Sequence, residues 1–296
     1  MPELPEVETV RRGLEPVMMN GLIKSVKLNR QNLRYPFPDQ FSKRLTNTNI
    51  QHVGRRGKYL MLETARNEAL IMHLGMSGSF RIESEAGSGT IGAYYHLRSE
   101  ARKHDHVVFE VENEQNTYWV IYNDPRRFGF MDLVPAENLG KCSHLKNMGI
   151  EPTGNVLNGA KISELFAGKN TPIKSALLDQ RFIAGLGNIY VCEALWRSGI
   201  SPKRKVRTIC RVDGKPTNRS ELLAHSIRDV LNEAIDAGGS SLKDHRQTDG
   251  QMGYFQHNFN VYDREGSSCP KQDCEGTIMR IVQSGRSTFY CPECQR

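Results

Sequence analysis

Residues 50–84 have the sequence IQHVGRRGKYLMLETARNEALIMHLGMSGSFRIES. Within them, the runs IQHVGRR, KYLMLET, ALIMHL and SFRIES are rich in β-branched and other apolar residues and are separated by Gly, Asn or Ser. Such runs are typical of β-strands. Further runs of this type are IKSVKLN (23–29), HVVFEVE (106–112), TYWVIYN (117–123) and FGFMDLV (128–134). Since no helical pattern interrupts them, they favour a β-sandwich or a barrel over a parallel sheet.

Helical patterns lie before and after these runs. Near the amino terminus, apolar residues recur at helical spacing, at Val7, Val10, Leu14 and Val17. After about residue 135, further helices are predicted in KISELFAG (161–168), PIKSALLDQ (172–180), NIYVCEALWRSG (188–199) and SELLAHSIRDVLNEAIDAGG (220–239), the last one capped by Ser220. The stretch EAGSGTIGA (85–93) is predicted to be a loop. The fold class is therefore α+β.

Length and composition limit the class of protein. The 296 residues have room for about two domains, and 38% hydrophobic with 25% charged residues is ordinary for a globular protein. No apolar run is long enough for a membrane helix, and MPELPEVETV lacks the basic and apolar regions of a signal peptide. We therefore expect a soluble protein that is not secreted.

The charge balance suggests a polyanionic partner. The chain has 40 basic and 33 acidic residues, a net charge of +7. The stretch 197–219 has a single acid, Asp213, among the basic residues Arg197, Lys203, Arg204, Lys205, Arg207, Arg211, Lys215 and Arg219. A local excess of this kind favours nucleic acid, but a solvated basic surface explains it equally well.

The carboxyl terminus has the spacing of a metal site. Of seven cysteines, Cys269, Cys274, Cys291 and Cys294 lie close to the end of the chain. Between the two pairs, TIMRIVQSGRSTFY is predicted to form a β-hairpin with its turn at Ser284-Gly285, which would bring the pairs together. Four thiolates favour one closed, structural zinc ion, and metal binding would stabilise a segment with few apolar residues.

Motifs along the whole chain resemble those of one protein family. MPELPEVETVRRGLEP, HLGMSGSF, KHDHV, DPRRFG, GLGNIYVCEAL, DGQMGYF and the terminal cysteines closely resemble, in the same order, the formamidopyrimidine-DNA glycosylases of bacterial base-excision repair. The resemblance implies three parts: a helix with a β-sandwich (1–135), a helix-two-turn-helix domain (136–260) and a zinc hairpin (261–296). It also implies a combined glycosylase and abasic-site lyase, which acts as a monomer on damaged duplex DNA in the bacterial cytoplasm, at the nucleoid.

The same resemblance assigns the catalytic residues. If Met1 is removed, Pro2 becomes a free secondary amine with a reference pKa of about 8, which the helix dipole and nearby cations would lower. Its attack on C1′ of the damaged nucleotide would give an iminium and then strand cleavage. By resemblance, Glu3 is the general acid at the sugar, Glu6 is a positioning residue, and Lys58 aids base release and β-elimination.

Contacts to DNA are also implied by the resemblance. Arg286 would clamp a phosphate and take part in δ-elimination, Asn188 would bind a phosphate at a helix start, and His104, Arg127 and Lys169 would be further backbone contacts. A base is reached only after it is flipped out of the stack, and the residues that match the family's void-filling set are Met76, Arg126 and Phe128. Residues 240–257 correspond to the lesion-capping loop. Without the resemblance, core packing would be the simpler interpretation of Met76 and Phe128.

Two alternatives remain at this stage. The endonuclease VIII-like branch removes oxidised pyrimidines, but MPELPE in place of MPEGPE and the 240–257 loop favour oxidised purines. The second alternative is a DNA-binding zinc protein that has no catalytic activity. The presence of Pro2, Glu3 and Lys58 argues against it. One departure from the family pattern is the first cysteine pair, C-x4-C where C-x2-C is usual, which leaves the geometry of that knuckle open.

Overall fold

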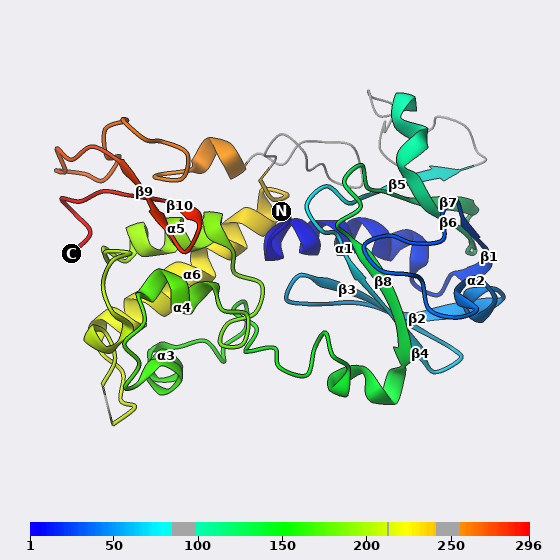
Figure 1. The fold of residues 1–296 in the computed structure, drawn as a ribbon, viewed down its shortest axis with the longest axis horizontal. Helices are drawn as coiled ribbons and strands as arrows, with labels where there is room; N and C mark the ends of the chain where they lie inside the picture. Colours follow the sequence, from blue (N-terminus) through cyan, green and yellow to red (C-terminus); the bar gives the residue numbers. More distant parts are fainter. Residues whose placement is uncertain (85–98, 212, 241–254) are drawn as a thin grey trace. The chain divides into compact units, whose positions relative to one another are not determined.

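The computed structural model describes residues 1–84, 99–211, 213–240 and 255–296 (Figure 1). The loop expected at 85–93 lies outside the described residues. The chain divides into two compact units, Met1–Lys146 with Ala237–Tyr254, and Asn147–Asp236 with Phe255–Arg296. Among the described residues, no helix is long and apolar enough to cross a membrane.

The first unit is built on antiparallel strands. The described residues contain an eight-stranded sheet with the order β5-β7-β6-β1-β2-β3-β4-β8. The strands are β1 (Leu22–Leu28), β2 (Thr48–Arg56), β3 (Tyr59–Thr64), β4 (Glu68–His73), β5 (Ser79–Ser84), β6 (Asp105–Glu112), β7 (Thr117–Asn123) and β8 (Phe130–Pro135). At the centre, β1 and β2 pair only through Leu22↔Asn49 and Ile23↔Thr48. Two four-stranded halves therefore meet at one end, and both contribute side chains to one core, as in a sandwich.

Helix α1 (Leu4–Met18) covers part of this core. Its predicted apolar face is buried, with Val10 and Leu14 fully enclosed. Shorter helical segments of the unit are α2 (Phe41–Leu45), η1 (Ser99–His104) and η2 (Ala136–Lys141). Burial of the α1 face against the strands fixes where the first residues of the chain lie relative to β2 and β3.

The second unit is helical and ends in a β-hairpin. Its helical segments are α3 (Gly159–Phe166), α4 (Ile173–Leu178), α5 (Asn188–Arg197), η3 (Val206–Thr208), α6 (Asn218–Asp236) and η4 (Phe255–Asn258). Strands β9 (Met279–Gln283) and β10 (Arg286–Tyr290) pair antiparallel through a two-residue turn. In that turn, Ser284 and Gly285 both have positive φ, 49° and 73°, which suits a tight hairpin. The mixed fold class is thus confirmed.

One local prediction is wrong. Helix α6 begins at Asn218, so Ser220 lies inside the first turn and does not cap the helix. Thr217 precedes the helix, and its hydroxyl accepts from the Ser220 N–H at 3.0 Å, while the Ser220 hydroxyl accepts from the Thr217 N–H at 2.8 Å. The reciprocal pair satisfies two backbone donors that a helix start leaves without partners.

Candidate active site and metal centre

The start of α1 holds two buried carboxylates. Glu3 and Glu6 are only 3% and 2% exposed. Glu6 Oε2 accepts from the Glu3 N–H at 2.8 Å, and Glu6 Oε1 accepts from the N–H and the hydroxyl of Ser240 at 2.8 and 2.9 Å. Pro2 is buried beside them, whereas Met1 is 51% exposed. Glu6 therefore fixes the first turn of α1 against Ser240, and the candidate nucleophile and acid lie on that turn.

Lys58 lies in the turn between β2 and β3. It is 7% exposed, and the preceding Gly57 has a φ of +56°, which favours glycine. Arg55 donates to the Gly57 carbonyl at 2.9 Å and to the carboxylate of Glu8 on α1 at 3.0 Å. Burial alone would raise the pKa of Glu8, but hydrogen bonds from Arg11 and Arg55 lower it. The ion pair therefore ties the turn that carries Lys58 to α1.

His73, at the end of β4, begins the HLGMSGSF motif but is not among the predicted site residues. Tyr59, which follows Lys58, pairs with His73 across β3 and β4, and the His73 ring stacks on Phe130 at 5.6 Å. Burial, followed by the charges of Lys58 and Arg34, lowers the pKa of His73 to about 4. The ring is therefore neutral at pH 7, which allows Nδ1 to accept from the Gly75 N–H at 3.1 Å.

Asp124 joins two loops of the first unit. It is 0% exposed. One of its oxygens accepts from the Ser77 hydroxyl at 2.6 Å, and the other accepts from the Gly129 N–H at 2.9 Å and from the Tyr122 hydroxyl at 3.2 Å. The loops also touch through their backbones, since a Cβ on Gly75 would lie 2.3 Å from the Gly129 nitrogen. Loops 74–78 and 124–129 therefore form one packed assembly.

This assembly carries the three residues predicted to fill the void. Met76 is half-buried, whereas Arg126 and Phe128 are exposed. Phe128 is 42% exposed, and the Arg126 guanidinium lies 4.9 Å from its ring centroid. Core packing is therefore the wrong interpretation of Phe128. Arg127 is exposed as well, in the left-handed backbone region at φ +55°.

His104 lies beside the same assembly. Its carbonyl accepts from the Asp124 N–H at 3.1 Å, and its ring is half-buried. The neighbouring acid, Asp105, is engaged within the fold, because it accepts from Arg81 at 2.8 Å and from the Asn123 amide at 2.7 Å. The half-buried His104 ring is thus more accessible to a ligand than the buried Asp105 carboxylate.

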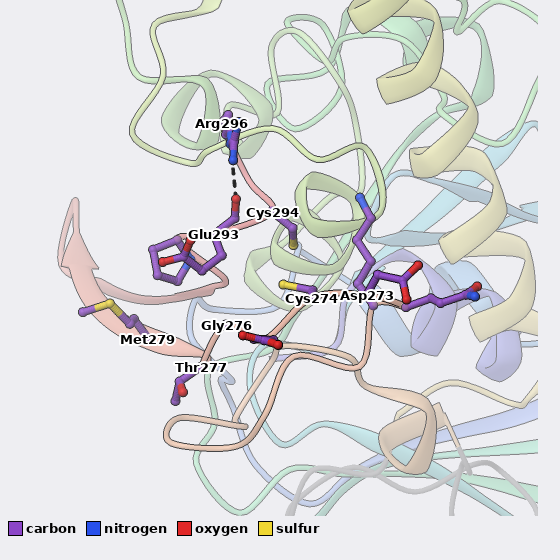
Figure 2. Close-up of a pocket in the computed structure, with 12 residues that line it drawn as sticks. Asp273, Cys274, Gly276, Thr277, Met279, Glu293, Cys294 and Arg296 are labelled. Atoms are coloured by element: carbon purple, nitrogen blue, oxygen red, sulfur yellow. Dashed lines mark hydrogen bonds between the residues drawn. The ribbon is translucent and has the colours of Figure 1, made fainter.

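The predicted metal ligands meet in the second unit. The sulfur atoms of Cys269, Cys274, Cys291 and Cys294 all lie within 4.8 Å of one another. The distances Cys269–Cys294 and Cys274–Cys291 are 3.8 and 3.6 Å, close to the separation of about 3.8 Å that four bonds of about 2.3 Å to a tetrahedral zinc require. Figure 2 shows the sulfurs of Cys274 and Cys294 turned toward each other at the rim of an open pocket. The C-x4-C loop thus still supplies two ligands to one cluster.

Helix α5 also contacts this cluster. The Trp196 indole N–H donates to the Cys269 sulfur at 3.4 Å. Burial alone would raise the pKa of the Cys269 thiol, but hydrogen bonds, first of all from Trp196, lower it. A donor to the thiolate form stabilises a metal ligand and orients it, so the cluster fits a metal ion both in geometry and in its surroundings.

The hairpin that carries Arg286 is held against α4 and α5. Arg286 is exposed at the first position of β10. The next carbonyl, of Ser287, accepts from the Lys174 ammonium and from the Asn188 side-chain amide, both at 2.9 Å. Lys174 is 1% exposed and also donates to the Thr288 hydroxyl at 2.6 Å. Two helices therefore fix the backbone beside Arg286.

Comparisons with known proteins show the family to which the chain belongs. A family model described as the formamidopyrimidine-DNA glycosylase N-terminal domain matches residues 1–131, and the H2TH domain of the same glycosylases matches residues 148–246. The chain belongs to the formamidopyrimidine-DNA glycosylase family. Formamidopyrimidine-DNA glycosylases are base-excision-repair enzymes that combine glycosylase and abasic-site lyase activities, as the motifs predicted.

Individual formamidopyrimidine-DNA glycosylases match over their whole length. The protein of Chelativorans sp. (strain BNC1) is 58% identical over 297 residues and covers 100% of both chains. Among solved structures, the Lactococcus lactis enzyme in complex with DNA containing N7-benzyl-Fapy-dG has a TM-score of 0.82, with 33% identity and full coverage of both chains. A MutM complex with DNA containing carbocyclic 8-oxo-G has a TM-score of 0.81 and the same identity and coverage.

The remaining predicted contacts of this formamidopyrimidine-DNA glycosylase family member lie in its second unit. Lys169 is half-buried, with its ammonium 5.2 Å from the centre of the Phe182 ring. In the basic stretch 197–219, the Arg197 guanidinium donates two hydrogen bonds to the Glu233 carboxylate, both at 2.6 Å. Arg211 forms an ion pair with Asp213 at 3.0 Å. Part of the stretch is thus neutralised within the fold, and its exposed cations other than Arg211 are Lys203, Lys205, Arg207, Lys215 and Arg219.

Proposed function

We propose that the protein removes oxidised purines from duplex DNA and cleaves the resulting abasic site through an amine at Pro2. The observation that carries the proposal is the start of α1, where Pro2 and Glu3 are buried on a turn held by Glu6 and Ser240. A buried, fixed amine and acid suit nucleophilic attack, since orientation lowers the barrier more than any single contact does.

The chemistry begins with removal of Met1, which frees the Pro2 nitrogen. The Pro2 nitrogen then bonds to C1′ while the bond from C1′ to the base breaks, and the base leaves with that electron pair and takes a proton. Loss of the amine proton and opening of the sugar leave an iminium between Pro2 and C1′. The iminium acidifies the 2′ hydrogen. A proton acceptor can therefore remove this hydrogen as a proton, and the electron pair that remains expels the 3′ phosphate. A second elimination releases the 5′ phosphate.

Two charged residues of the first unit assist these steps. Glu3 protonates the sugar oxygen as the ring opens, and Lys58 assists departure of the base and the β-elimination. The low exposure of both residues strengthens their electrostatic effects, because a group removed from water is less screened. Glu6 acts by positioning, through the hydrogen bonds described above.

The DNA contacts divide between the two units. In the first, Met76, Arg126 and Phe128 fill the space of the flipped nucleotide, with an apolar wedge and a guanidinium for the orphaned base. His104 and Arg127 bind backbone phosphates there. In the second unit, the phosphate contacts are Lys169, Asn188 and Arg286. The lesion-capping role is proposed for residues 240–257, of which 241–254 lie outside the described residues.

We further propose that the four-cysteine cluster holds one structural zinc ion. Zinc would supply folding free energy to the hairpin and no catalytic step. The domain division is proposed at 1–135, 136–260 and 261–296, and the protein is proposed to act as a monomer in the bacterial cytoplasm, at the nucleoid.

Oxidised purines are favoured as the substrate by two relatives. The MutM and Lactococcus lactis structures described above contain DNA with 8-oxo-G and Fapy-dG analogues. Another Lactococcus lactis structure contains DNA with an oxidised pyrimidine, so activity on pyrimidine lesions is the second candidate.

Borohydride trapping tests the proposal. Borohydride reduces the iminium to a stable amine, so the native protein should become crosslinked to duplexes containing 8-oxoguanine, and more slowly to duplexes with an oxidised pyrimidine. A duplex with no lesion should give no crosslink, because no iminium forms. A protein with an additional, uncleaved residue before Pro2 should bind the duplex without crosslinking. Crosslinking of the extended protein would exclude Pro2 as the nucleophile, and binding without crosslinking by the native protein would support a non-catalytic DNA-binding protein.

A further inference from the structure

Two exposed arginine–aromatic pairs lie on the first unit. The Arg34 guanidinium is 5.4 Å from the centroid of the Tyr35 ring, and Arg126 has the same relation to Phe128 at 4.9 Å. Tyr35 is 50% exposed and Phe128 is 42% exposed. Single exposed apolar side chains are normal on a protein surface, whereas exposed apolar side chains that cluster mark an interaction site.

The two pairs belong to one continuous structure. The Arg34 N–H donates to the Gly129 carbonyl at 3.1 Å, directly after Phe128. The Tyr35 ring packs edge-on against Phe130 at 5.5 Å. Within its own loop, Leu33 donates to the Tyr35 carbonyl at 3.0 Å. The backbone of residues 33–35 is therefore fixed to the 124–129 loop, so the position of Arg34 relative to that loop is defined.

The Arg34 charge is not neutralised within the described part of the protein. No carboxylate there lies within ion-pair distance of the Arg34 guanidinium, unlike Arg44, which is paired with Glu68, and Arg81, which is paired with Asp105. The charge of Arg34 does act on His73, where it adds to burial and to the charge of Lys58 in lowering the pKa. Arg34 therefore shares its surroundings with the residues at the end of β4.

A guanidinium stacked on an aromatic ring is prepared to bind an anion. Stacking uses the face of the guanidinium and leaves its N–H edge available, and this edge matches two phosphate oxygens. The ring also limits the rotamers of the arginine, so less side-chain entropy is lost on binding. Basic and aromatic side chains in alternation are typical of surfaces that bind nucleic acid backbones.

We propose that Arg34, held by Tyr35, binds a phosphate of the DNA backbone next to the site contacted by the 124–129 loop. The inference rests on the proposed function, because it takes DNA as the ligand of that loop. Arg34 would contact the backbone and not a base, so it would contribute equally to damaged and undamaged duplexes. Its position on a separate segment, before β2, extends the binding surface beyond the residues of the DPRRFG motif.

Salt-dependent binding tests the inference. Binding of a fluorescent duplex with a stable abasic-site analogue would be titrated from low to moderate salt for the native protein, Arg34→Ala, Arg34→Lys and Lys27→Ala. Lys27 is an exposed cation on β1 of the same unit and serves as the matched control. Each phosphate contact contributes a log–log slope of about 0.9, so Arg34→Ala should have a slope shallower by about one.

The variants separate the outcomes. Arg34→Lys keeps the charge but loses the planar stacking, so it should keep the native slope with a several-fold weaker Kd, and Lys27→Ala should match the native protein. The ratio of affinities for damaged and undamaged duplexes should not change for Arg34→Ala. A native slope in folded Arg34→Ala, or an equal change in Lys27→Ala, would overturn the inference. Failure of the native protein to crosslink under borohydride would contradict the proposed function instead, without affecting the slope comparison.

Discussion

Glu6 and Ser240 are 234 residues apart in the sequence, yet one carboxylate oxygen of Glu6 accepts from both the amide and the hydroxyl of Ser240. The other oxygen accepts from the Glu3 N–H. Glu6 and Ser240 are almost fully buried, so water cannot replace these hydrogen bonds within the fold. The first turn of α1 and Ser240, which is the first residue of the proposed lesion-capping loop, are therefore positioned by a single side chain.

Glu6→Gln should lower both stability and activity. The amide keeps one oxygen acceptor but places an NH2 group opposite a backbone donor, which leaves a buried donor without a partner at a cost of about 1–3 kcal/mol. Ser240→Ala removes only the hydroxyl donor and should cost about 1 kcal/mol. Urea unfolding and the rate of borohydride crosslinking would measure the two effects.

Glu15→Gln is the control for that comparison. Glu15 lies on the same helix, and its side chain is 45% exposed and paired with Arg11, so its replacement should change stability by at most about 1 kcal/mol. If Glu6→Gln were as stable and as active as the native protein, Glu6 would not be a positioning residue.

Cys291→Ser should remove zinc and DNA affinity while leaving most of the protein folded. Three thiolates would hold the proposed zinc ion less tightly, and we expect the hairpin to depend on that ion. The helices of the second unit have their own buried residues, such as Ile227 and Leu231 on α6, so circular dichroism should stay near native. Metal analysis by mass spectrometry and binding titrations would test this, with Cys142→Ser, outside the cluster, as a control that keeps one zinc per chain.

Arg286→Ala should keep its zinc, unlike Cys291→Ser. The ligands and the contacts of Lys174 and Asn188 to Ser287 do not involve the arginine side chain, so zinc should be retained. Loss of one phosphate contact should make the log–log salt dependence of binding shallower by about one. Arg280 is the comparison on β9, and because it is engaged with Ser287 and Glu265, its replacement by Ala should change the slope less. Equal slopes for native protein and Arg286→Ala would exclude the phosphate contact.

The secondary structure was largely accessible from local patterns. Short runs rich in β-branched and other apolar residues, bounded by turn residues, identified all of β1–β8 to within a few residues. The hairpin turn at Ser284-Gly285 was predictable for a related reason, since few residues tolerate positive φ. The start of α6 was misplaced because Thr217 and Ser220 are both good capping residues and only their geometry distinguishes them.

The contacts that hold the site residues in place could not be predicted from local sequence patterns. Lys174 looks like a surface lysine in the sequence, yet it is buried and donates to β10, more than a hundred residues later. Asp124 belongs to a recognised motif, but its contact with Ser77 depends on how two loops pack. Such contacts follow from tertiary packing, which spacing along the chain does not record.

The pH dependence of stability offers a test of the His73 environment. Burial comes first among the causes, and the charges of Lys58, Arg34 and His144 add to it, so that the pKa of His73 is lowered from 6.5 to about 4. Burial also lowers the pKa of His106. In both cases the unfolded chain binds a proton more readily than the folded protein does. Stability is therefore complete above about pH 6.5 and falls as the pH decreases toward 4.

His73→Gln should weaken this pH dependence, because glutamine does not titrate. Between pH 7 and pH 5, the native protein should lose about 2 kcal/mol through His73 alone, because the full slope of about 1.4 kcal/mol per pH unit is reached only below the unfolded pKa of 6.5. The variant should lack that loss and retain only the part due to His106 and other groups. Urea unfolding of both proteins at pH 7 and pH 5 gives the difference directly, and the variant should be the less stable protein at pH 7, since its side chain does not reproduce the stacking of the His73 ring on Phe130. Parallel losses of stability in the two proteins would show that His73 is protonated in the folded state at pH 5, and that neither burial nor the charges of Lys58 and Arg34 lower its pKa as described.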